Sequence, residues 1–361
     1  MNGRPRVAIV GLGVNGLCTA WALIRAGFRG ELLLLDRFPA GHGRGSSHGA
    51  ERITRTTYAT AAFAADARRA QNELWPALQR DVGRVLVTPG PAVFWGPESG
   101  PLPLYARAMA EAGGAVEELS PAAARLRFPS MTFPDAERVL VDPNAGVLHA
   151  AETLSALEGW LGARGSLRRV VQVDDLRSDD AGVDLLTAEG VVRAEAVVCS
   201  AGPWLPGLLP AYANQLIPVR QHVGFWEMEV RAGEAPAWVH LGPDGLHYGL
   251  PSLAGGSMKA AFHRTSGAAD VPDVVEEADA ERIADMGSRL NRWFAPAPGS
   301  LVRSETCWYT NAPGDQFVIE PCADHPRVLA LSACSGHAFK MGPLTGFRAA
   351  ENVLRMLGSG S

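Results

Sequence analysis

Hydrophobic residues follow one another without interruption in two short stretches near the N-terminus. Residues 7–10 form the first stretch and residues 32–35 the second, and they predict strands over 6–10 and 31–35 that are buried on both faces. Between them, apolar residues recur at helical spacing from Leu17 to Ile24, and Gly27 follows as a stop signal. The pattern predicts a strand, a helix and a second strand parallel to the first.

The rest of the chain mixes strand-like and helix-like patterns. Alternation with a period of two predicts a hairpin over residues 182–186 and 191–194. A buried run predicts a strand over 196–200, and an antiparallel pair is expected at 85–89 and 92–95. Further strands are expected at 219–230, 245–250, 258–263 and 328–332, and helices at 104–111, 276–294 and 347–357.

This order of elements predicts a mixed α/β (α+β) chain with two intertwined domains, because 361 residues exceed the usual size of one core. The opening unit and the later buried strands suit a Rossmann-like, dinucleotide-binding domain made of residues 1–80, 145–217 and 310–361. The intervening segments, 81–144 and 218–309, are expected to form a mostly antiparallel-sheet domain that holds the substrate.

A glycine turn joins the first strand to the first helix. Gly11 allows the tight turn, Gly13 lets the backbone approach a pyrophosphate, and Gly16 permits close packing of helix on strand. The helix N-terminus, at Val14 and Asn15, offers N–H groups to phosphates, and Asp36 stands where a carboxylate binds a ribose hydroxyl. The motif predicts a bound dinucleotide and leaves FAD and NAD both open.

Composition narrows the class of partner. A formal net charge of −5 gives no basic footprint for nucleic acid or an anionic membrane, so we expect a small-molecule partner. The apolar runs are far shorter than the ~20 residues that a bilayer requires, and the N-terminus does not resemble a signal peptide. Five scattered cysteines without a CxxC pair argue against a disulfide framework or a metal site and suit the cytoplasm.

Residues 45–58, GSSHGAERITRTTY, carry concentrated positive charge, and Arg52 and Arg55 would share a helix face. A solvated basic turn is the alternative interpretation. The segment resembles one that lies against the flavin in monomeric sarcosine oxidases and N-methyltryptophan oxidases. Blocks that resemble the same family follow in its order: DPNAGVL (142–148), SAGPW (200–204), PVRQ (218–221), YGLPS (248–252), MKAAFH (258–263), TCWYT (306–310) and SGHAFK (335–340).

The resemblance implies that the dinucleotide is FAD, held covalently by a thioether from Cys307. Such a link needs a thiolate, which the neighbouring cations Arg52 and His48 would favour, whereas a small buried hydrophobe is the alternative for Cys307. The residues expected to bind the cofactor are Gly11, Gly13, Val14, Asn15, Gly16, Asp36, Arg37, Ser46, Ser47, His48, Arg52, Val173, Ala201, Gly202, Trp204, Cys307, Gly336, His337, Phe339 and Lys340.

The resemblance also implies how a substrate is bound and oxidised. Arg55 and Lys340 match a carboxylate clamp, in which a guanidinium holds a carboxylate bidentately and an ammonium neutralises the remaining charge. Tyr248 and Gly336 are expected beside the substrate. Lys259 matches the lysine that serves oxygen activation, as a charge placed where superoxide forms. The remaining expected catalytic residues are His263, Arg52, Tyr248 and Tyr309.

Several positions depart from the family's pattern and leave the substrate open. Glu51 replaces a small polar residue and is expected to pair with Arg52, while Leu250 and Ala338 alter the pocket. The expected activity is oxidation of the C–N bond of an N-methyl or cyclic secondary amino acid, with a primary amino acid as a further option, to an imine by a monomer, with O2 reduced to H2O2. A flavin dehydrogenase or demethylase with another electron acceptor, a nicotinamide-linked dehydrogenase and a non-catalytic flavoprotein are the alternatives.

Overall fold

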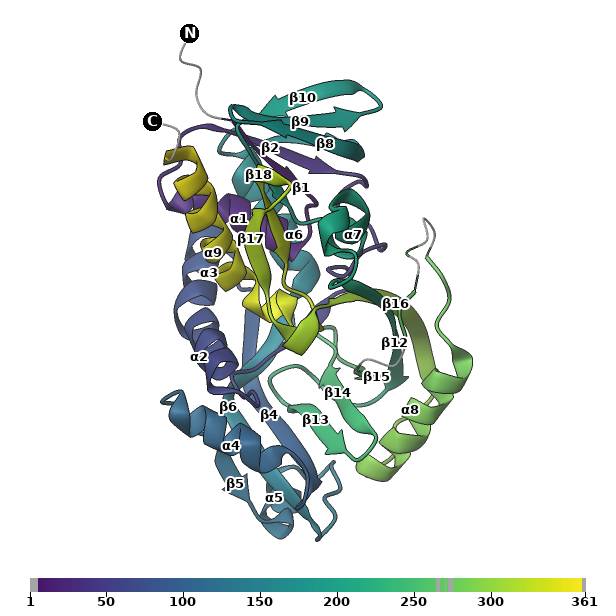
Figure 1. The fold of residues 1–361 in the computed structure, drawn as a ribbon. Coiled ribbons are helices and arrows are strands. Elements are labelled where there is room, and N and C mark those ends of the chain that lie inside the picture. The colour runs from purple at the N-terminus through teal and green to yellow at the C-terminus, as the bar shows by residue number, and fades with distance from the viewer. Residues whose placement is uncertain (1–5, 264–266, 270, 272–274, 359–361) are drawn as a thin grey trace.

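Three sheets organise the chain in the computed structural model, which describes residues 6–263, 267–269, 271 and 275–358 (Figure 1). The six-stranded sheet has the order β17-β18-β11-β1-β2-β7, and its neighbours run parallel except β17 and β18. Its strands are β1 (Arg6–Val10), β2 (Glu31–Asp36), β7 (Leu167–Val170), β11 (Ala196–Cys199), β17 (Val318–Cys322) and β18 (His325–Ser332).

Both faces of this sheet are covered, as its uninterrupted apolar strands predict. Val7 and Ile9 of β1 face the helical side, and Ala8 and Val10 face the other side. The helical side holds α1 (Val14–Arg25), α2 (Ala61–Arg69), a π-helical turn η1 (Ala70–Leu74), α3 (Trp75–Val82), α6 (Ala150–Gly162) and α9 (Ala338–Gly358). The other side holds α7 (Leu205–Leu208) and the antiparallel sheet β8 (Val173–Asp179), β9 (Gly182–Thr187) and β10 (Gly190–Ala194).

The third sheet has the order β16-β12-β15-β14-β13-β4-β6-β3, with the short β5 beside β6. Among the strands that the structure describes in it, β4 and β13 run parallel and the other neighbours antiparallel. Its strands are β3 (Glu51–Thr54), β4 (Val87–Pro97), β5 (Glu117–Leu119), β6 (Glu137–His149), β12 (Ile217–Glu227), β13 (Ala237–Gly242), β14 (Gly245–Pro251), β15 (Ser257–Phe262) and β16 (Leu301–Asn311).

Helices cover this third sheet on the sides away from the first. Figure 1 shows α4 (Leu102–Glu111) and α5 (Pro121–Arg127) at the end of β4 and β6, and α8 (Ala280–Trp293) against β12 and β15. Short 3-10 turns, η2 (Gly202–Trp204), η3 (Pro210–Tyr212) and η4 (Pro313–Asp315), complete the chain. The fold thus confirms a Rossmann-like sheet intertwined with a mostly antiparallel sheet, while the exact domain boundaries stay a prediction.

Three predicted elements differ in the structure. Residues 85–89 and 92–95 do not pair with each other; both belong to β4, whose two halves pair with the long β6 across a bulge between Gly90 and Ala92. Pro89 and Pro91, on either side of Gly90, have no N–H group to donate to β6, so the bulge breaks no hydrogen bond from these two residues. Helix α8 begins at Ala280 rather than at residue 276, because the Asp279 carboxylate caps the N–H groups of Glu281 and Arg282.

The closing helix α9 starts at Ala338, nine residues before the predicted start at 347. Its first turns contain Gly342, Pro343 and Gly346, which act against a helix prediction. The glycines are required by packing against α1: a Cβ on Gly346 would lie 2.5 Å from the carbonyl carbon of Cys18, and one on Gly342 would lie 2.6 Å from a Val14 methyl. The predicted hairpin at 182–194 is confirmed as β9 and β10.

Candidate active site

A cavity of about 1200 Å³ opens between the parallel sheet and the third sheet. Strand ends of the first sheet, the loop of residues 45–58, strands β14 to β16 and the start of α9 all line it. Every residue that the sequence predicted for cofactor, substrate or catalysis lines this cavity except Gly16: Gly11, Gly13, Val14, Asn15, Asp36, Arg37, Ser46, Ser47, His48, Arg52, Arg55, Val173, Ala201, Gly202, Trp204, Tyr248, Lys259, His263, Cys307, Tyr309, Gly336, His337, Phe339 and Lys340.

The glycine turn has the geometry that a pyrophosphate needs. Gly11 has a φ of +93°, and a Cβ on it would lie 2.4 Å from the carbonyl oxygen of Ser200. Gly16 packs helix on strand, since its Cβ would lie 2.1 Å from the carbonyl oxygen of Gly11. Gly13 caps α1 and has no side chain of its own, and the N–H of Val14 in the first turn donates to Ser47 Oγ at 3.1 Å. Ser47 and the first turn of α1 both line the cavity.

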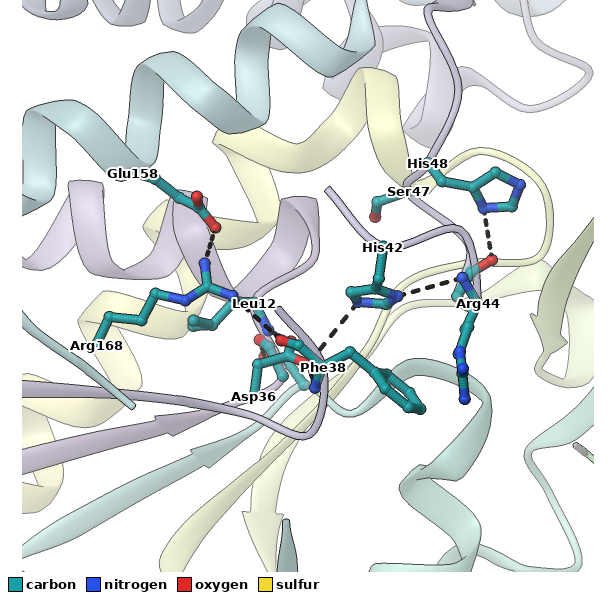
Figure 2. A network of polar contacts seen from close by, with 12 residues as sticks. Leu12, Asp36, Phe38, His42, Arg44, Ser47, His48, Glu158 and Arg168 are labelled. Atoms are coloured by element: carbon teal, nitrogen blue, oxygen red, sulfur yellow. Dashed lines mark hydrogen bonds and ion pairs between the residues drawn. The ribbon is translucent and has the colours of Figure 1, made fainter. Parts of the chain in front are cut away.

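The far end of the nucleotide region is built around the Asp36 carboxylate (Figure 2). Its Oδ2 accepts the N–H of Leu12 at 2.7 Å and its Oδ1 the N–H of Phe38 at 2.8 Å. His42 Nε2 lies 3.8 Å from Oδ1, and burial lowers the pKa of His42. Arg168 of β7 pairs with Glu158 and donates to the carbonyl oxygen of Phe38, which holds this loop in place.

Sequence reasoning missed Phe38, His42, Glu158 and Arg168. Nothing local signals them, because Arg168 reaches this edge only through the parallel pairing of β7 with β2. The cradle fits a dinucleotide: Trp204 lines it, and within the described residues its buried Nε1 has no hydrogen-bond partner. Buried polar groups are normally satisfied, so this N–H group is suited to a bound polar ligand.

The basic segment is an extended strand and a loop rather than a helix, so Arg52 and Arg55 do not share a helix face. Arg52 lies in β3 and donates to the backbone carbonyls of Glu51, Ser46 and His48. Its expected pairing with the Glu51 carboxylate is wrong, since Arg52 contacts only the carbonyl of that residue in the hydrogen bonds of the described chain. Burial and the neighbouring Arg52 lower the pKa of His48.

Cys307 stands on the cavity face of β16, two residues from Tyr309 on the same face. Burial raises the pKa of the Cys307 thiol, and the nearby charges of Arg52 and Lys259 lower it less than burial raises it. In the protein without a bound ligand, the protonated thiol of Cys307 is therefore favoured over the expected thiolate. Cys18, Cys199 and Cys322 are buried in the core, and Cys334 is half-buried and also lines the cavity.

Strand register brings the expected catalytic residues of β14 and β15 to the same wall. Tyr248 lies opposite Ala261, and Lys259 lies opposite Phe225, whose ring is 5.5 Å from the ammonium. Lys259 is 4% exposed, and burial lowers its pKa to about 8. Burial raises the pKa of Tyr248 to about 12, so its phenol stays protonated at neutral pH. His263 Nδ1 lies 3.3 Å from the Tyr309 hydroxyl.

Arg55 and Lys340 meet at another part of the cavity wall. The Arg55 guanidinium lies over the rings of Tyr58 at 4.1 Å and Phe94 at 5.6 Å. Lys340, in the first turn of α9, is 7% exposed, and burial followed by the charge of Arg55 lowers its pKa well below the ordinary value. Among the described residues no carboxylate forms an ion pair with either side chain, which leaves two adjacent cations beside the cavity.

Sequence reasoning also missed the role of Asp142, although it named the surrounding segment. Asp142 in β6 is fully buried, and its carboxylate accepts the N–H groups of Thr56 and Thr57 at 2.7 and 3.0 Å. It thereby shapes the loop that presents Arg55 to the cavity. An aspartate within a buried strand is the available signal, but its partners Thr56 and Thr57 are 86 and 85 residues away in sequence.

A glycine turn on a parallel sheet, a carboxylate at the end of the second strand and a long cavity ending at a second sheet are typical of a dinucleotide-dependent oxidoreductase. The sequence profile of FAD dependent oxidoreductases matches residues 6–352, and the chain belongs to this family. FAD as the cofactor and the expected enzyme class are thereby confirmed. No described helix is long and apolar enough to span a membrane.

Individual relatives agree with the family. Monomeric sarcosine oxidase from Bacillus sp. (strain B-0618) is 28% identical over 346 residues, with 92% of this chain and 88% of the relative covered. N-methyl-L-tryptophan oxidase from Yersinia pestis (strain Pestoides F) is 28% identical, with 94% and 92% covered. The resemblance on which the sequence analysis relied is therefore confirmed.

Solved structures agree in fold. The open form of NikD, an unusual amino acid oxidase essential for nikkomycin biosynthesis, superposes with a TM-score of 0.84 at 24% identity, over 97% of this chain and 94% of NikD. Glycine oxidase from Geobacillus kaustophilus gives a TM-score of 0.79 at 18% identity, over 97% of this chain and 95% of that protein. At these identities the likeness concerns the fold alone.

Proposed function

We propose that the protein oxidises the C–N bond of an N-methyl or cyclic secondary amino acid to an imine and passes the electrons to O2, which yields H2O2. The observation that carries the proposal is the pair Arg55 and Lys340, two adjacent cations on the cavity wall without a carboxylate partner in the described chain. A guanidinium and an ammonium in a cavity of this kind bind a carboxylate, and the substrate must supply that carboxylate. The names of the relatives, sarcosine and N-methyl-L-tryptophan oxidases, support the same class of substrate.

The aromatic wall orients the amine. Tyr248, Tyr309 and His263 lie on the face of the third sheet that lines the cavity, and Tyr309 contacts His263 through its hydroxyl. The substrate nitrogen must lose its proton before electrons leave the C–N bond, so activity should rise with pH across the pKa of the bound amine. His263, as a histidine facing the cavity, is the group placed to influence that proton.

The cofactor-binding residues of the glycine turn, Asp36 and the loop at Ser46 and Ser47 would hold FAD across the cavity. When bound, FAD supplies the hydride-accepting chemistry, and the protein positions the substrate carbon. We propose that Cys307 holds the flavin covalently. The position of Cys307 on the cavity wall and the nearby cations Arg52 and Lys259, which lower the cost of forming a thiolate, support this proposal.

We also propose the division into a FAD-binding part (residues 1–80, 145–217 and 310–361) and a substrate part (81–144 and 218–309). The six strands of the parallel sheet all fall inside the first part, which supports it, whereas β3 lies in the first part and pairs in the third sheet. A monomer in the cytoplasm completes the proposal. The free state of the five cysteines and the relatives named monomeric support it.

Covalent attachment is tested by acid denaturation of wild type, Cys307→Ser and Cys334→Ser. Cys334 is the matched control, because it is a second thiol on the same cavity wall. We expect the yellow chromophore to precipitate with wild type and Cys334→Ser and to remain in solution with Cys307→Ser. Chromophore that leaves the wild-type protein would reject the covalent link and reopen the choice between oxidase and dehydrogenase.

The substrate class is tested with matched pairs of amines, each an N-methyl amino acid and the same amine without its carboxylate. We expect anaerobic bleaching of the flavin by the acids and a rate lower by at least about 10-fold with the carboxylate-free amines, since a charge-assisted hydrogen bond contributes about 1.5–3 kcal/mol. Equal rates would mean that Arg55 and Lys340 do not bind a carboxylate. No bleaching by any amine would indicate a non-catalytic flavoprotein.

A further inference from the structure

Glu51 is a buried carboxyl group on the wall of the active-site cavity. It begins β3, is 1% exposed and lines the cavity. Within the described residues, neither of its carboxyl oxygens has a hydrogen-bond partner. An ionised carboxylate in such a place normally collects several N–H donors, because desolvation without hydrogen bonds is costly. The absence of donors favours a neutral carboxylic acid.

Charged groups on three strands surround Glu51. Lys259 faces it from β15, Arg303 and Glu305 from β16, and Arg52 from its own strand. On the β6 side its strand partner is His149, whose Nε2 is hydrogen-bonded to Thr88 Oγ1. Burial has the largest effect and raises the pKa of Glu51, as does the charge of Glu305, while the three cations lower it. The net shift of the pKa is upward, which favours the protonated form.

Lys259 is the cation with the largest electrostatic effect on Glu51. Its ammonium donates to the carbonyl oxygen of Glu51 at 3.4 Å rather than to the carboxyl group. The two side chains thus share one part of the cavity wall without forming a fixed ion pair, since no such pair between them occurs among the described residues. A proton can leave Glu51 there, and the resulting carboxylate finds the Lys259 ammonium as its neighbour.

We propose that Glu51 holds a proton beside Lys259 and donates it to the oxygen that is reduced at the flavin. The proposal rests on the proposed function, in which O2 is the acceptor. Reduction of O2 to H2O2 takes two electrons and two protons. A bound, reduced anionic flavin would supply both electrons and one proton and would be oxidised, and the O–H bond of Glu51 would break to supply the second proton. Solvent then returns a proton to the carboxylate.

The alternative role for Glu51 is a fixed negative charge, and it predicts the opposite result. A permanent carboxylate would weaken the positive field of Lys259 and slow the reaction of the reduced flavin with O2. Glu51→Gln would then accelerate reoxidation, because the amide removes that charge. If Glu51 donates a proton, Glu51→Gln slows reoxidation instead, by about 100-fold, since a positioned general acid contributes roughly 10²–10⁴-fold.

Two measurements test the proposal. The first is infrared spectroscopy of the oxidised protein, in which wild type minus Glu51→Gln should show the C=O band of a protonated carboxylic acid at neutral pH. The second is stopped-flow reoxidation by O2 after chemical reduction of the flavin, so that no amine substrate is needed. The reoxidation rate constant should follow the intensity of that band as the pH rises.

Glu305→Gln is the matched control. Glu305 also lines the cavity and acts on Lys259, but its carboxylate pairs with Arg303 at 2.6 Å. Its removal should leave the infrared band present and reoxidation pH-dependent, with the dependence shifted to lower pH because Glu305 raises the pKa values of Glu51 and Lys259. Glu51→Thr, with flavin loading checked by absorbance, provides a second variant without an ionisable proton and should reoxidise as slowly as Glu51→Gln.

The outcomes separate the two proposals. A missing carboxylic acid band, or reoxidation of Glu51→Gln as fast as wild type or faster, overturns the role of Glu51 while the oxidase function stands. A wild-type reduced flavin that does not react with O2 overturns both. Slow reoxidation of Glu51→Gln, together with a carboxylic acid band whose intensity follows the wild-type reoxidation rate as the pH changes, supports proton donation by Glu51.

Discussion

Asp142 offers the sharpest test of how the fold prepares the carboxylate clamp. The fully buried carboxylate accepts backbone N–H groups of Thr56, Thr57 and Asn144 at 2.7, 3.0 and 3.0 Å. The Thr56 hydroxyl lies 3.1 Å from each of its oxygens. Arg55 immediately precedes this anchored pair, so its position depends on Asp142 rather than on its own strand.

The loss of stability in Asp142→Ala follows from the N–H donors that are left without an acceptor. Three backbone N–H groups lose their acceptor, and each buried donor left unsatisfied costs about 1–3 kcal/mol. Local relaxation favours the lower end of that range, so we expect a loss of about 3 kcal/mol in the free energy of unfolding. At roughly 2 °C per kcal/mol for a chain of this size, the melting temperature falls by about 6 °C.

Catalysis should respond through binding. Because the Thr56–Thr57 backbone is released, Arg55 loses its fixed approach to the cavity, and KM for an N-methyl amino acid should rise by at least about 10-fold. Asp142→Asn should give an intermediate loss, since the amide retains one oxygen acceptor and presents an NH2 group to the remaining donors. Thermal unfolding and steady-state kinetics measure the two effects.

Asp135→Ala serves as the matched control for this series. Asp135 is an exposed carboxylate that pairs with Arg125 at 2.7 Å, and exposed pairs contribute about 0–1 kcal/mol. We expect its melting temperature and KM to remain near the wild-type values. If Asp142→Ala also melted within about 1 °C of wild type and kept its KM, the inference that Asp142 organises the Arg55 loop would be refuted.

Three further predictions concern the cavity. Lys340→Met should raise KM for carboxylate substrates by roughly 10–100-fold. The pKa of Lys340 in the folded protein lies well below the unfolded value of 10.5, so the stability of the wild type rises with pH in that interval. Any gain in melting temperature of the variant at neutral pH should therefore shrink as the pH approaches 10.5. Gly336→Ala should lose activity and about 1–2 kcal/mol of stability, since φ is +80° and the new Cβ would lie 2.4 Å from His263 Cε1. The control Gly83→Ala, with φ +67° and no atom within 4 Å, should lose stability alone. Thermal melts and kcat/KM compare the two variants, and equal activities would contradict the clash. Lys259→Met should keep the rate of anaerobic flavin reduction and lose at least about 10-fold in the rate of reoxidation by O2. In wild type the reoxidation rate should fall as the pH rises through about 8, where Lys259 loses its charge. A pH-independent wild-type rate would exclude the role of Lys259 in oxygen activation.

Much of the nucleotide region could be predicted because it depends on local chemistry. The turn at Gly11 needs a positive φ, the helix needs a start after Gly13, and β2 ends at Asp36, and all of these lie within 31 residues of one another. Strand β16, which places Cys307 and Tyr309 on one face, is not among the predicted elements. The prediction of α9 failed at its first turns, where the glycines are there for contact with α1.

The sequence by itself determined the class of fold, the glycine turn and the residue types available to the cavity, since backbone preferences and periodicity act over a few residues. Only the tertiary structure decided which of them meet. Lys340 lies beside Arg55, and Glu51 beside Lys259, through pairings of β3, β15 and α9 that join positions about 200 to 300 residues apart. Long-range register and burial set those contacts, and with them the pKa values of the buried lysines and of Glu51.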